Sequence, residues 1–393
     1  MREGIEYKSL SIVCTKITDG SHFSPKEDED GAYPMLSVKD MKSRGFEYTA
    51  CKYINEHDYK VLVANGCKPN VNDVLVAKDG SYLKTAFVLK EDREQALLSS
   101  IAIITPRLDI INPDYLAFFF KASHTKAIVE KHYLTGTAIK RIILKGFRSI
   151  QIPVPPLSEQ QRIVSELDLL SSIIEKKKAQ LKEYDQLAQS IFYDMFGDPV
   201  TNEKGWEVKK LGEVCYIGLG FTHTPTYVDK GVPFLSVKDI TGGEIDFSDI
   251  KYVSENEYMN APKGAKPQKG DILFCRVGTM GKPVIIKTDV HFCTFVSLGY
   301  LSILYNRLNN IYIKYWMLSD GFNSQVEANV RGLAIKNLNT GWLKMFNIPL
   351  PPLPLQQSFA SKIEAIERQK ALIQQSIAEV QMLFDSRMDD WFA

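Results

Sequence analysis

The chain contains the same unit twice. The pentapeptide Leu36–Asp40 recurs unchanged as Leu235–Asp239, and the Pro-rich segment Ile152–Leu157 recurs with one change as Ile348–Leu353. Further matches keep the same order along both halves, with an offset that falls from 201 to 196 residues. An ordered series of this length indicates an internal duplication. The fold must therefore be built from two copies of one unit.

Each copy ends in a segment with a heptad pattern, Leu157–Phe196 and Leu353–Phe392. Apolar residues recur there at alternating steps of three and four, which predicts two coiled-coil helices. The seam contains Ile163, Leu167, Leu170, Ile174 and Leu181 in the first helix and Ile363, Ile366, Ile373, Ile377 and Phe384 in the second. Because both segments share one register, each can be the partner of the other. We expect an antiparallel pair in which the numbers of facing residues sum to 554.

The ends of the first helix carry recognisable signals. Ser158 and Gln161 are expected to form a capping box, and Gly197 is expected to end the helix. The second helix lacks the serine and has Pro354 in a first-turn position instead. A helix of roughly 36 residues would be on the order of 54 Å long. The pair would therefore separate the two globular parts.

The segment before each helix shows short strand signals followed by helical signals. Asn112-Pro113 and Asn310 are expected to begin equivalent helices. We therefore predict an α+β fold with two repeated mixed α/β domains, two long antiparallel helices and pseudo-two-fold symmetry. The expected divisions are residues 1–152 and 199–348 for the domains, and 153–198 and 349–393 for the helices.

The net charge of +1 conceals an uneven distribution. Residues 1–152 hold 22 basic and 19 acidic side chains, and residues 199–348 hold 17 and 14, whereas the two helical segments are acidic. Two mildly basic domains therefore alternate with acidic helices, although so small an excess is weak support for a nucleic-acid partner. Six cysteines without a CxxC pair, no signal peptide and no membrane-length apolar run predict a cytoplasmic protein.

Several motifs resemble catalytic signatures but lack the residues that the chemistry needs. Asn112–Tyr115 resembles an amino-methyltransferase motif, yet its third residue departs and the second copy loses the proline. Gly278–Lys282 lacks the Walker spacing, and Glu175–Lys177 lies on the heptad helix without a partner carboxylate. His291 and Cys293 do not reach a zinc ligand set. We therefore expect neither catalysis nor a metal site in this chain.

Basic and polar residues recur at matched positions in the two domains. Basic side chains near glycines suit phosphate contacts, because the backbone can approach the phosphate there. The candidate DNA-binding residues are His22, Lys39, Lys78, Ser81, Lys84 and Lys140 in the first copy and His223, Lys238, Arg276, Thr279, Lys282 and Lys336 in the second. The alternative interpretation is structural: a copied lysine can support the shared fold, and the two histidines can be ordinary loop residues. His22 and His223 are taken as equivalent positions.

The ordered motifs resemble those of the specificity subunit of type I restriction-modification systems. The resemblance covers nearly the whole chain and includes the Ile-Pro-x-Pro-Pro-Leu segments, the Leu-Ser-Val-Lys-Asp segments, the Gly-x-Ala-Ile-Lys segments and Ser158-Glu159-Gln160-Gln161. The second copy reads Pro354-Leu355-Gln356-Gln357 at the last of these, so it keeps only the two glutamines.

The resemblance implies a non-catalytic DNA-binding subunit. Each domain would read one half of a bipartite target in double-stranded DNA, and the helices would fix the spacer and dock two modification subunits. Restriction subunits would join through the complex. S-adenosylmethionine, ATP and magnesium would belong to the partner subunits, and no membrane is involved. The alternative is a coiled-coil scaffold that presents two protein-binding domains without DNA.

Overall fold

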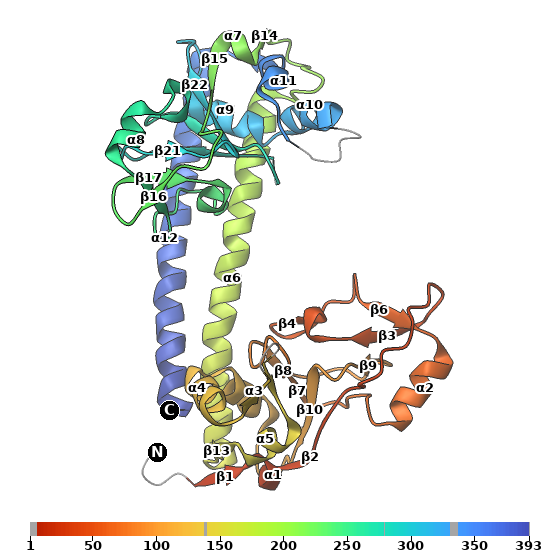
Figure 1. Cartoon of the computed structure of the whole chain (residues 1–393). Helices are drawn as coiled ribbons and strands as arrows, with labels where there is room; N and C mark the ends of the chain where they lie inside the picture. Colours follow the sequence, from red (N-terminus) through yellow and green to blue (C-terminus); the bar gives the residue numbers. More distant parts are fainter. Residues whose placement is uncertain (1–5, 137–139, 279, 331–336, 393) are drawn as a thin grey trace. The chain divides into compact units, whose positions relative to one another are not determined.

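The protein, a computed structural model, is described over residues 6–136, 140–278, 280–330 and 337–392. It divides into two compact units, residues 1–178 with 375–393 and residues 179–374. The long helices α6 (Leu157–Phe196) and α12 (Leu353–Phe392) each contribute one part to either unit (Figure 1). Among the described helices, none combines the length and the apolar character that a membrane span requires.

The first unit is a mixed α/β domain. Its elements before α6 are β1 (Tyr7–Ser9), α1 (Leu10–Val13), β2 (Cys14–Asp19), β3 (Tyr33–Leu36), η1 (Val38–Asp40), β4 (Met41–Lys42), β5 (Gly45–Phe46), β6 (Lys52–Ile54), α2 (Glu56–Ala64), β7 (Val74–Ala77), β8 (Ala86–Val88), β9 (Ala96–Leu97), β10 (Ile101–Pro106), α3 (Pro113–Lys121), α4 (Ser123–His132), β11 (Leu134–Thr135), β12 (Arg141–Ile142), α5 (Leu144–Ser149) and β13 (Gln151–Pro153). The central sheet has the strand order β2-β10-β7-β8, and a second sheet has the order β6-β3-β9.

The second unit repeats this plan. Its elements are β14 (Glu207–Lys210), α7 (Leu211–Val214), β15 (Cys215–Leu219), β16 (Tyr227–Val228), β17 (Val232–Leu235), η2 (Val237–Ile240), β18 (Lys251–Val253), α8 (Glu255–Asn260), η3 (Lys263–Ala265), β19 (Ile272–Cys275), β20 (Gly281–Ile285), β21 (Cys293–Thr294), β22 (Leu298–Ile303), α9 (Asn310–Met317), α10 (Asp320–Val330), α11 (Thr340–Lys344) and β23 (Asn347–Leu350). The sheet order β15-β22-β19-β20 matches that of the first unit. The predicted α+β fold with two mixed α/β domains and two packed long helices is confirmed.

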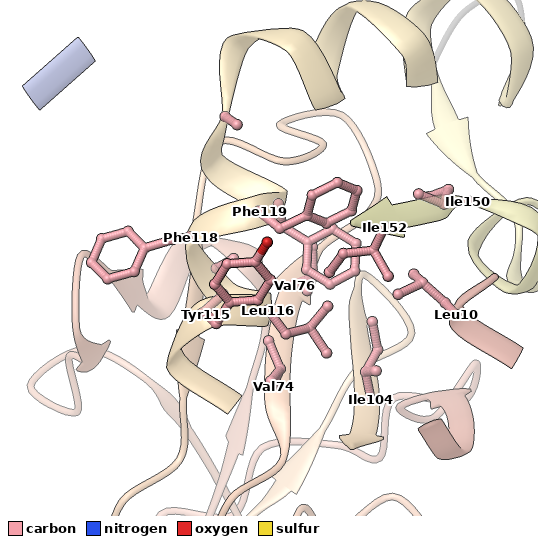
Figure 2. Close-up of a cluster of buried hydrophobic side chains, with 14 of the residues drawn as sticks. Leu10, Val74, Val76, Ile104, Tyr115, Leu116, Phe118, Phe119, Ile150 and Ile152 are labelled. Carbon is pink, nitrogen blue, oxygen red and sulfur yellow. The ribbon is translucent and has the colours of Figure 1, made fainter. Parts of the chain in front are cut away.

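The central sheet of the first unit is buried on both faces because its strand residues alternate between two cores. One face packs against α3, where Val74, Val76 and Ile104 meet Tyr115, Leu116 and Phe119 (Figure 2). The other face packs against the segment around β4 and β5, where Leu75, Ile101 and Ile103 meet Met41 and Phe46. Both faces are apolar, so these strands are nearly continuous runs of hydrophobic residues.

The helices α6 and α12 pack antiparallel within each unit. In the first unit, Arg387 Nε lies 2.8 Å from Glu166 Oε1. In the second unit, Lys370 Nζ lies 2.7 Å from Asp185 Oδ1, and the Phe359 ring packs against Phe192. The two ion pairs lie within one residue of the predicted register. Lys370 occupies a seam position of α12 between Ile366 and Ile373, and its long side chain lets the ammonium reach a carboxylate of the other helix.

The predicted seam residues are buried or half-buried. The buried members are Ile163, Leu167, Leu170, Ile174, Ile363 and Ile366, and the half-buried members are Leu181, Ile373, Ile377 and Phe384. A two-helix pair covers only one side of each helix, which accounts for the half-buried members.

A single glutamine attaches each domain to the start of its helix. Gln160 is fully buried; its Oε1 accepts the N–H of Asn112 (2.8 Å), and its Nε2 donates to the carbonyls of Ile110 (3.0 Å) and Pro155 (2.8 Å). Gln356 makes the same three bonds, with Asn309 N–H and the carbonyls of Arg307 and Pro351. Every buried polar atom of these side chains is thus satisfied.

The predicted capping box at Ser158 and Gln161 is wrong. The helix α6 begins at Leu157, and the carbonyl of Pro156 accepts the N–H groups of Glu159 and Gln160 at 2.9 and 3.0 Å. Ser158 therefore lies inside the first turn, and the Gln161 side chain accepts from Asn112 Nδ2 instead. The predicted end of the helix is confirmed, because Gly197 has φ +75° and donates to the carbonyl of Tyr193.

Candidate nucleic-acid interface

Four strand ends of the first unit meet at one edge of the central sheet. β2 and β7 finish there, at Asp19 and Ala77, and β8 and β10 begin there. The antiparallel register brings this about, since Ala102 faces Asp19 while Ile101 faces Ala77. The loops that follow β2 and β7 must therefore lie close together. The second unit has the same arrangement at the ends of β15 and β19.

The turn Lys78–Lys84 is a tight structure at this edge. Gly80 has φ +66° and Leu83 has φ +53°. The N–H of Gly80 donates to the carbonyl of Lys140 (2.9 Å), and the N–H of Ile142 donates to the carbonyl of Lys78 (3.0 Å). These bonds bring the turn and the segment around Lys140 together. Four predicted residues, Lys78, Ser81, Lys84 and Lys140, therefore belong to one cluster.

Lys78 lies beneath this cluster. The residue is 5% exposed, and its ammonium forms ion pairs with Asp19 and Asp79, each at 3.2 Å. Asp19 also lies 3.4 Å from the exposed His22. The lysine charge is therefore neutralised inside the protein, and its position favours a structural role over a phosphate contact.

Arg276 is the counterpart of Lys78 in the second unit, but it hydrogen-bonds backbone carbonyls where Lys78 forms ion pairs with carboxylates. It is 7% exposed, and its guanidinium donates to the carbonyls of Leu338 (3.0 Å) and Val296 (2.8 Å). Burial lowers the pKa of this guanidinium from its usual value. Its backbone carbonyl accepts from Leu338 N–H, as Lys78 does from Ile142. Both basic residues thus hold the same two segments together.

Lys39 and Lys238 lie on the short helices η1 and η2. A serine–aspartate capping box closes each helix, and the N–H of Val38 donates to Ser100 Oγ at 3.3 Å. The carbonyl of Ser100 in turn accepts from Lys78 N–H. Lys39 therefore belongs to the same edge of the sheet. Lys238 donates to Asp249, and this hydrogen bond raises its pKa.

The predicted residues fall into three groups. The exposed group can reach a ligand: His22, Lys39, Ser81, Lys84, Lys140, His223, Lys238 and Lys282. Lys78 and Arg276 are buried. Thr279 and Lys336 lie outside the described residues.

The equivalence of His22 and His223 is wrong. Ser21 N–H donates to Leu97 and Phe221 N–H donates to Thr294, so Ser21 corresponds to Phe221. His22 then corresponds to Thr222, and His223 corresponds to Phe23. The reason is a β-bulge between Thr105 and Pro106, which shifts the pairing of β2 by one residue.

Sequence comparison of the two copies also missed Arg141, which lies at this edge, and Arg44, which lies on the turn between β4 and β5. Arg141 is exposed and pairs with Asp79 in an isolated bridge, but its counterpart is Asn337, so a search for matched basic residues passes over it. Arg44 reaches Asp168 of α6 at 3.3 Å. The signal for Arg141 was its position directly after Lys140. Arg44 had no signal, because its partner is 124 residues away in the chain.

The comparisons with known proteins agree with this architecture. The family described as "Type I restriction modification DNA specificity domain" matches residues 2–183 and again 203–382. The chain belongs to this family. Each match ends inside a long helix, so the repeated family unit comprises a domain and most of the helix that follows it.

Two specificity subunits of type I restriction enzymes are similar to this chain along most of their length. The chain is 24% identical over 367 residues to the type I restriction enzyme MjaVIII specificity subunit of Methanocaldococcus jannaschii, covering 87% of this chain and 80% of the relative. It is 22% identical over 385 residues to the EcoBI specificity subunit of Escherichia coli, covering 89% and 77%.

Two solved structures share the fold. The S subunit of a type I restriction-modification system from M. genitalium matches with a TM-score of 0.55 at 11% identity, covering 100% of this chain and 98% of that one. A chain solved in work on assembly and conformational transition of the type I system matches with a TM-score of 0.60 at 20% identity, covering 100% and 98%.

Membership of this family assigns the chain its role. It is the DNA specificity subunit of a type I restriction-modification system, and the subunit itself is non-catalytic. The cofactors of such systems reside on the modification and restriction subunits. Within the described residues, no group of three or more His, Cys, Asp or Glu side chains could hold a metal ion.

Proposed function

We propose that the two domains, residues 1–152 and 199–348, each read one half of a bipartite target in double-stranded DNA. The observation that supports this is the repeated loop cluster: in both units the same sheet edge carries exposed basic side chains over a buried basic residue. Lys84 and Lys140 are exposed in the first unit, and Lys282, the counterpart of Lys84, is exposed in the second. Exposed lysines beside a positive-φ glycine suit phosphate contacts.

The test is a fluorescence titration of the chain with its modification subunits against duplexes that do or do not contain the target. Adenine methylation mapped across the source genome supplies that target. Lys84→Ala and Lys140→Ala should each weaken binding to all duplexes and reduce the slope of log affinity against log salt by about 0.9. Binding that does not respond to salt would identify a protein-binding scaffold instead of a DNA reader.

Exchange of one domain separates the two halves of the target. Residues 1–152 end in the Pro-rich strand that precedes α6, so a foreign domain can join at the same strand. Replacing residues 1–152 with the first domain of another specificity subunit should change one half-site and leave the other as it was. The measurement is the methylation pattern on plasmid libraries. A change in both half-sites would contradict the proposal that each domain reads only one of them.

The helices, residues 153–198 and 349–393, are proposed to set the spacer and to dock two modification subunits. Outside the seam, Leu187 is 47% exposed and Leu383, at the equivalent position of the repeat, is 48% exposed. Leucines in water are unfavourable, so a repeated exposed pair suits two copies of one apolar partner. Restriction subunits would join through this complex, which acts on DNA in the cytoplasm with S-adenosylmethionine, ATP and magnesium bound by the partners.

Charge at these leucines tests the docking surface. Leu187→Lys and Leu383→Lys should each remove one modification subunit from the complex, and the double variant should remove both, as measured by native mass spectrometry. The matched control is Lys182→Ala, an exposed polar change on the same helix. Full assembly of the double variant would place the docking surface elsewhere.

A further inference from the structure

Phe23 presents an aromatic ring to solvent at the proposed DNA-reading edge. The residue is 69% exposed, which makes it the most exposed of the large aromatic side chains in the described part of the chain. It follows His22 directly, and the two side chains share the loop after β2. Phe23 did not belong to the residues predicted from sequence, because the comparison of the copies matched the histidines.

The loop that carries Phe23 is fixed on both sides. The N–H of Ser21 donates to Leu97 at 2.7 Å, and its carbonyl accepts from Ser99 at 2.9 Å. A Cβ at Gly20 would lie 2.1 Å from the carbonyl oxygen of Leu97, so only glycine permits this close approach. The Ser21 hydroxyl donates to the carbonyl of Phe23 at 2.6 Å.

The chain beyond the ring is anchored as well. Pro25 is buried, and the Lys52 ammonium donates to Ser24 Oγ at 3.0 Å and to the carbonyl of Pro25. The exposure of Phe23 is therefore a property of a well-held loop. Binding residues are found disproportionately on loops that a rigid scaffold holds in place, so this fixed and exposed ring is a candidate ligand contact.

The loop around the ring has mixed charge. After Phe23 it carries Lys26 and then the acidic run Glu27–Asp30. Asp19, which precedes the ring, is 11% exposed at its side chain and forms an ion pair with the Lys78 ammonium at 3.2 Å. The buried lysine thus removes a negative charge from beneath the loop. Lys78 contributes to the interface in this way without a contact of its own.

The equivalent position in the second unit carries a different ring. Backbone pairing matches Phe23 with His223, which is also exposed. The preceding anchor also differs: Phe221 is buried against Phe234, whereas Ser21 makes the hydroxyl bond described above. One backbone position therefore offers an apolar ring in one half and a hydrogen-bonding ring in the other.

We propose that Phe23 reads the C5-methyl group of a thymine in the half-site bound by the first domain, while His223 offers a polar contact to the other half-site. This inference rests on the proposed function. The thymine methyl is the apolar feature of the major groove, and phenylalanine is one of the side chains that contacts it. The alternative is insertion of the ring between base pairs, which requires unstacking and a kink of the duplex.

The test replaces each thymine of the mapped target with deoxyuridine, which lacks only the methyl group. With the full complex of wild-type chain and modification subunits, one substitution in the first half-site should weaken binding about fourfold, as expected for the loss of one buried methyl group. Phe23→Ala should bind the natural duplex about fourfold more weakly and should lose the difference between thymine and uracil at that position.

Two matched variants complete the experiment. His223→Ala, at the equivalent position, should weaken binding through the second half-site and keep the uracil effect in the first. Leu108→Ala, an exposed apolar residue of the same unit, should change neither. All variants should melt at the wild-type temperature, because the substituted side chains are exposed.

The failures are distinguishable. If target binding is intact and no thymine of the first half-site responds to uracil, the role of Phe23 is wrong while the proposed function stands. A Phe23-dependent brightening of 2-aminopurine without a uracil effect would replace methyl contact by base-step insertion. If the wild-type complex shows no preference for the target, both the proposed function and this inference are wrong.

Discussion

Lys78 and Lys84 begin and end the same turn but have opposite surroundings. Lys78 is buried between Asp19 and Asp79, whereas Lys84 is exposed. Lys78→Met should destabilise the protein by about 3–5 kcal/mol, because it leaves partly buried carboxylates without their counter-charge. Urea unfolding of the two variants measures the difference. Lys84→Ala should stay within about 0.5 kcal/mol of wild type and act only on DNA affinity.

Arg276 is buried like Lys78, but it hydrogen-bonds backbone carbonyls instead of carboxylates. Arg276→Lys should cost about 1–3 kcal/mol, because an ammonium cannot reach both backbone carbonyls that the planar guanidinium satisfies. Lys78→Arg should also destabilise, since the larger side chain must fit between two carboxylates.

Equal stability of Lys78→Met and Lys84→Ala in urea would contradict the assignment of Lys78 to the interior.

Residue types could be predicted from sequence at this edge, but not their surroundings. Both copies carry a basic residue before a glycine, and this pattern is the same whether the side chain is buried or exposed. The bulge opposite Thr105 and Pro106 leaves only a one-residue change of offset between the copies, from 201 at Cys14 and Cys215 to 200 at Gly20 and Gly220, and the match of the two histidines overlooked it. Hence the two histidines were matched in sequence, although backbone pairing matches His223 with Phe23.

At the scale of elements, the attachment of domain to helix depends on Gln160 and Gln356. Gln160→Ala leaves the N–H of Asn112 and the carbonyls of Ile110 and Pro155 without their partner. We expect a loss of about 3 kcal/mol in the free energy of unfolding, since each buried unsatisfied group costs about 1–3 kcal/mol and water will reach some of them. Urea denaturation monitored by tryptophan fluorescence measures it.

The neighbouring glutamine is the natural control for this prediction. Gln161→Ala removes only one exposed bond to the Asn112 side chain and should change stability by about 0.5 kcal/mol or less. Gln356→Ala should resemble Gln160→Ala, because its three partners are the same groups in the second unit. If Gln160→Ala and Gln161→Ala lower the free energy of unfolding by similar amounts, the substitutions act on the start of the helix and not on the buried hydrogen bonds.

The long helices were the elements best predicted from sequence, because two segments with the same heptad pattern are expected to pair with each other. Their register was correct to within one residue, as Glu166 with Arg387 and Asp185 with Lys370 demonstrate. The first turn was not predicted correctly. The Ser158 pattern suits a cap, but the carbonyl of Pro156 already accepts the first N–H groups, and the helix begins at Leu157. A tertiary contact, the buried Gln160, decides the geometry there.

For the whole molecule, the duplication and the continuous helices lead to a prediction about spacing. Each helix has 40 residues without a break, so a change in its length must appear as a change in the proposed spacer. Removing one heptad from each helix at facing positions, 174–180 and 374–380, keeps the register of the seam. It shortens the pair by about 10.5 Å, which is roughly three base-pair steps of about 3.4 Å.

The expected result is a target with the same two half-sites and a spacer about three base pairs shorter. Methylation of a library with randomised spacer lengths measures it. Deleting residues 174–180 alone is the control: the seams of α6 and α12 then no longer match on both sides of the deletion, and specific binding should be lost. An unchanged spacer after the double deletion would mean that the helices join the domains without measuring DNA, and that the domains set their own separation on the duplex.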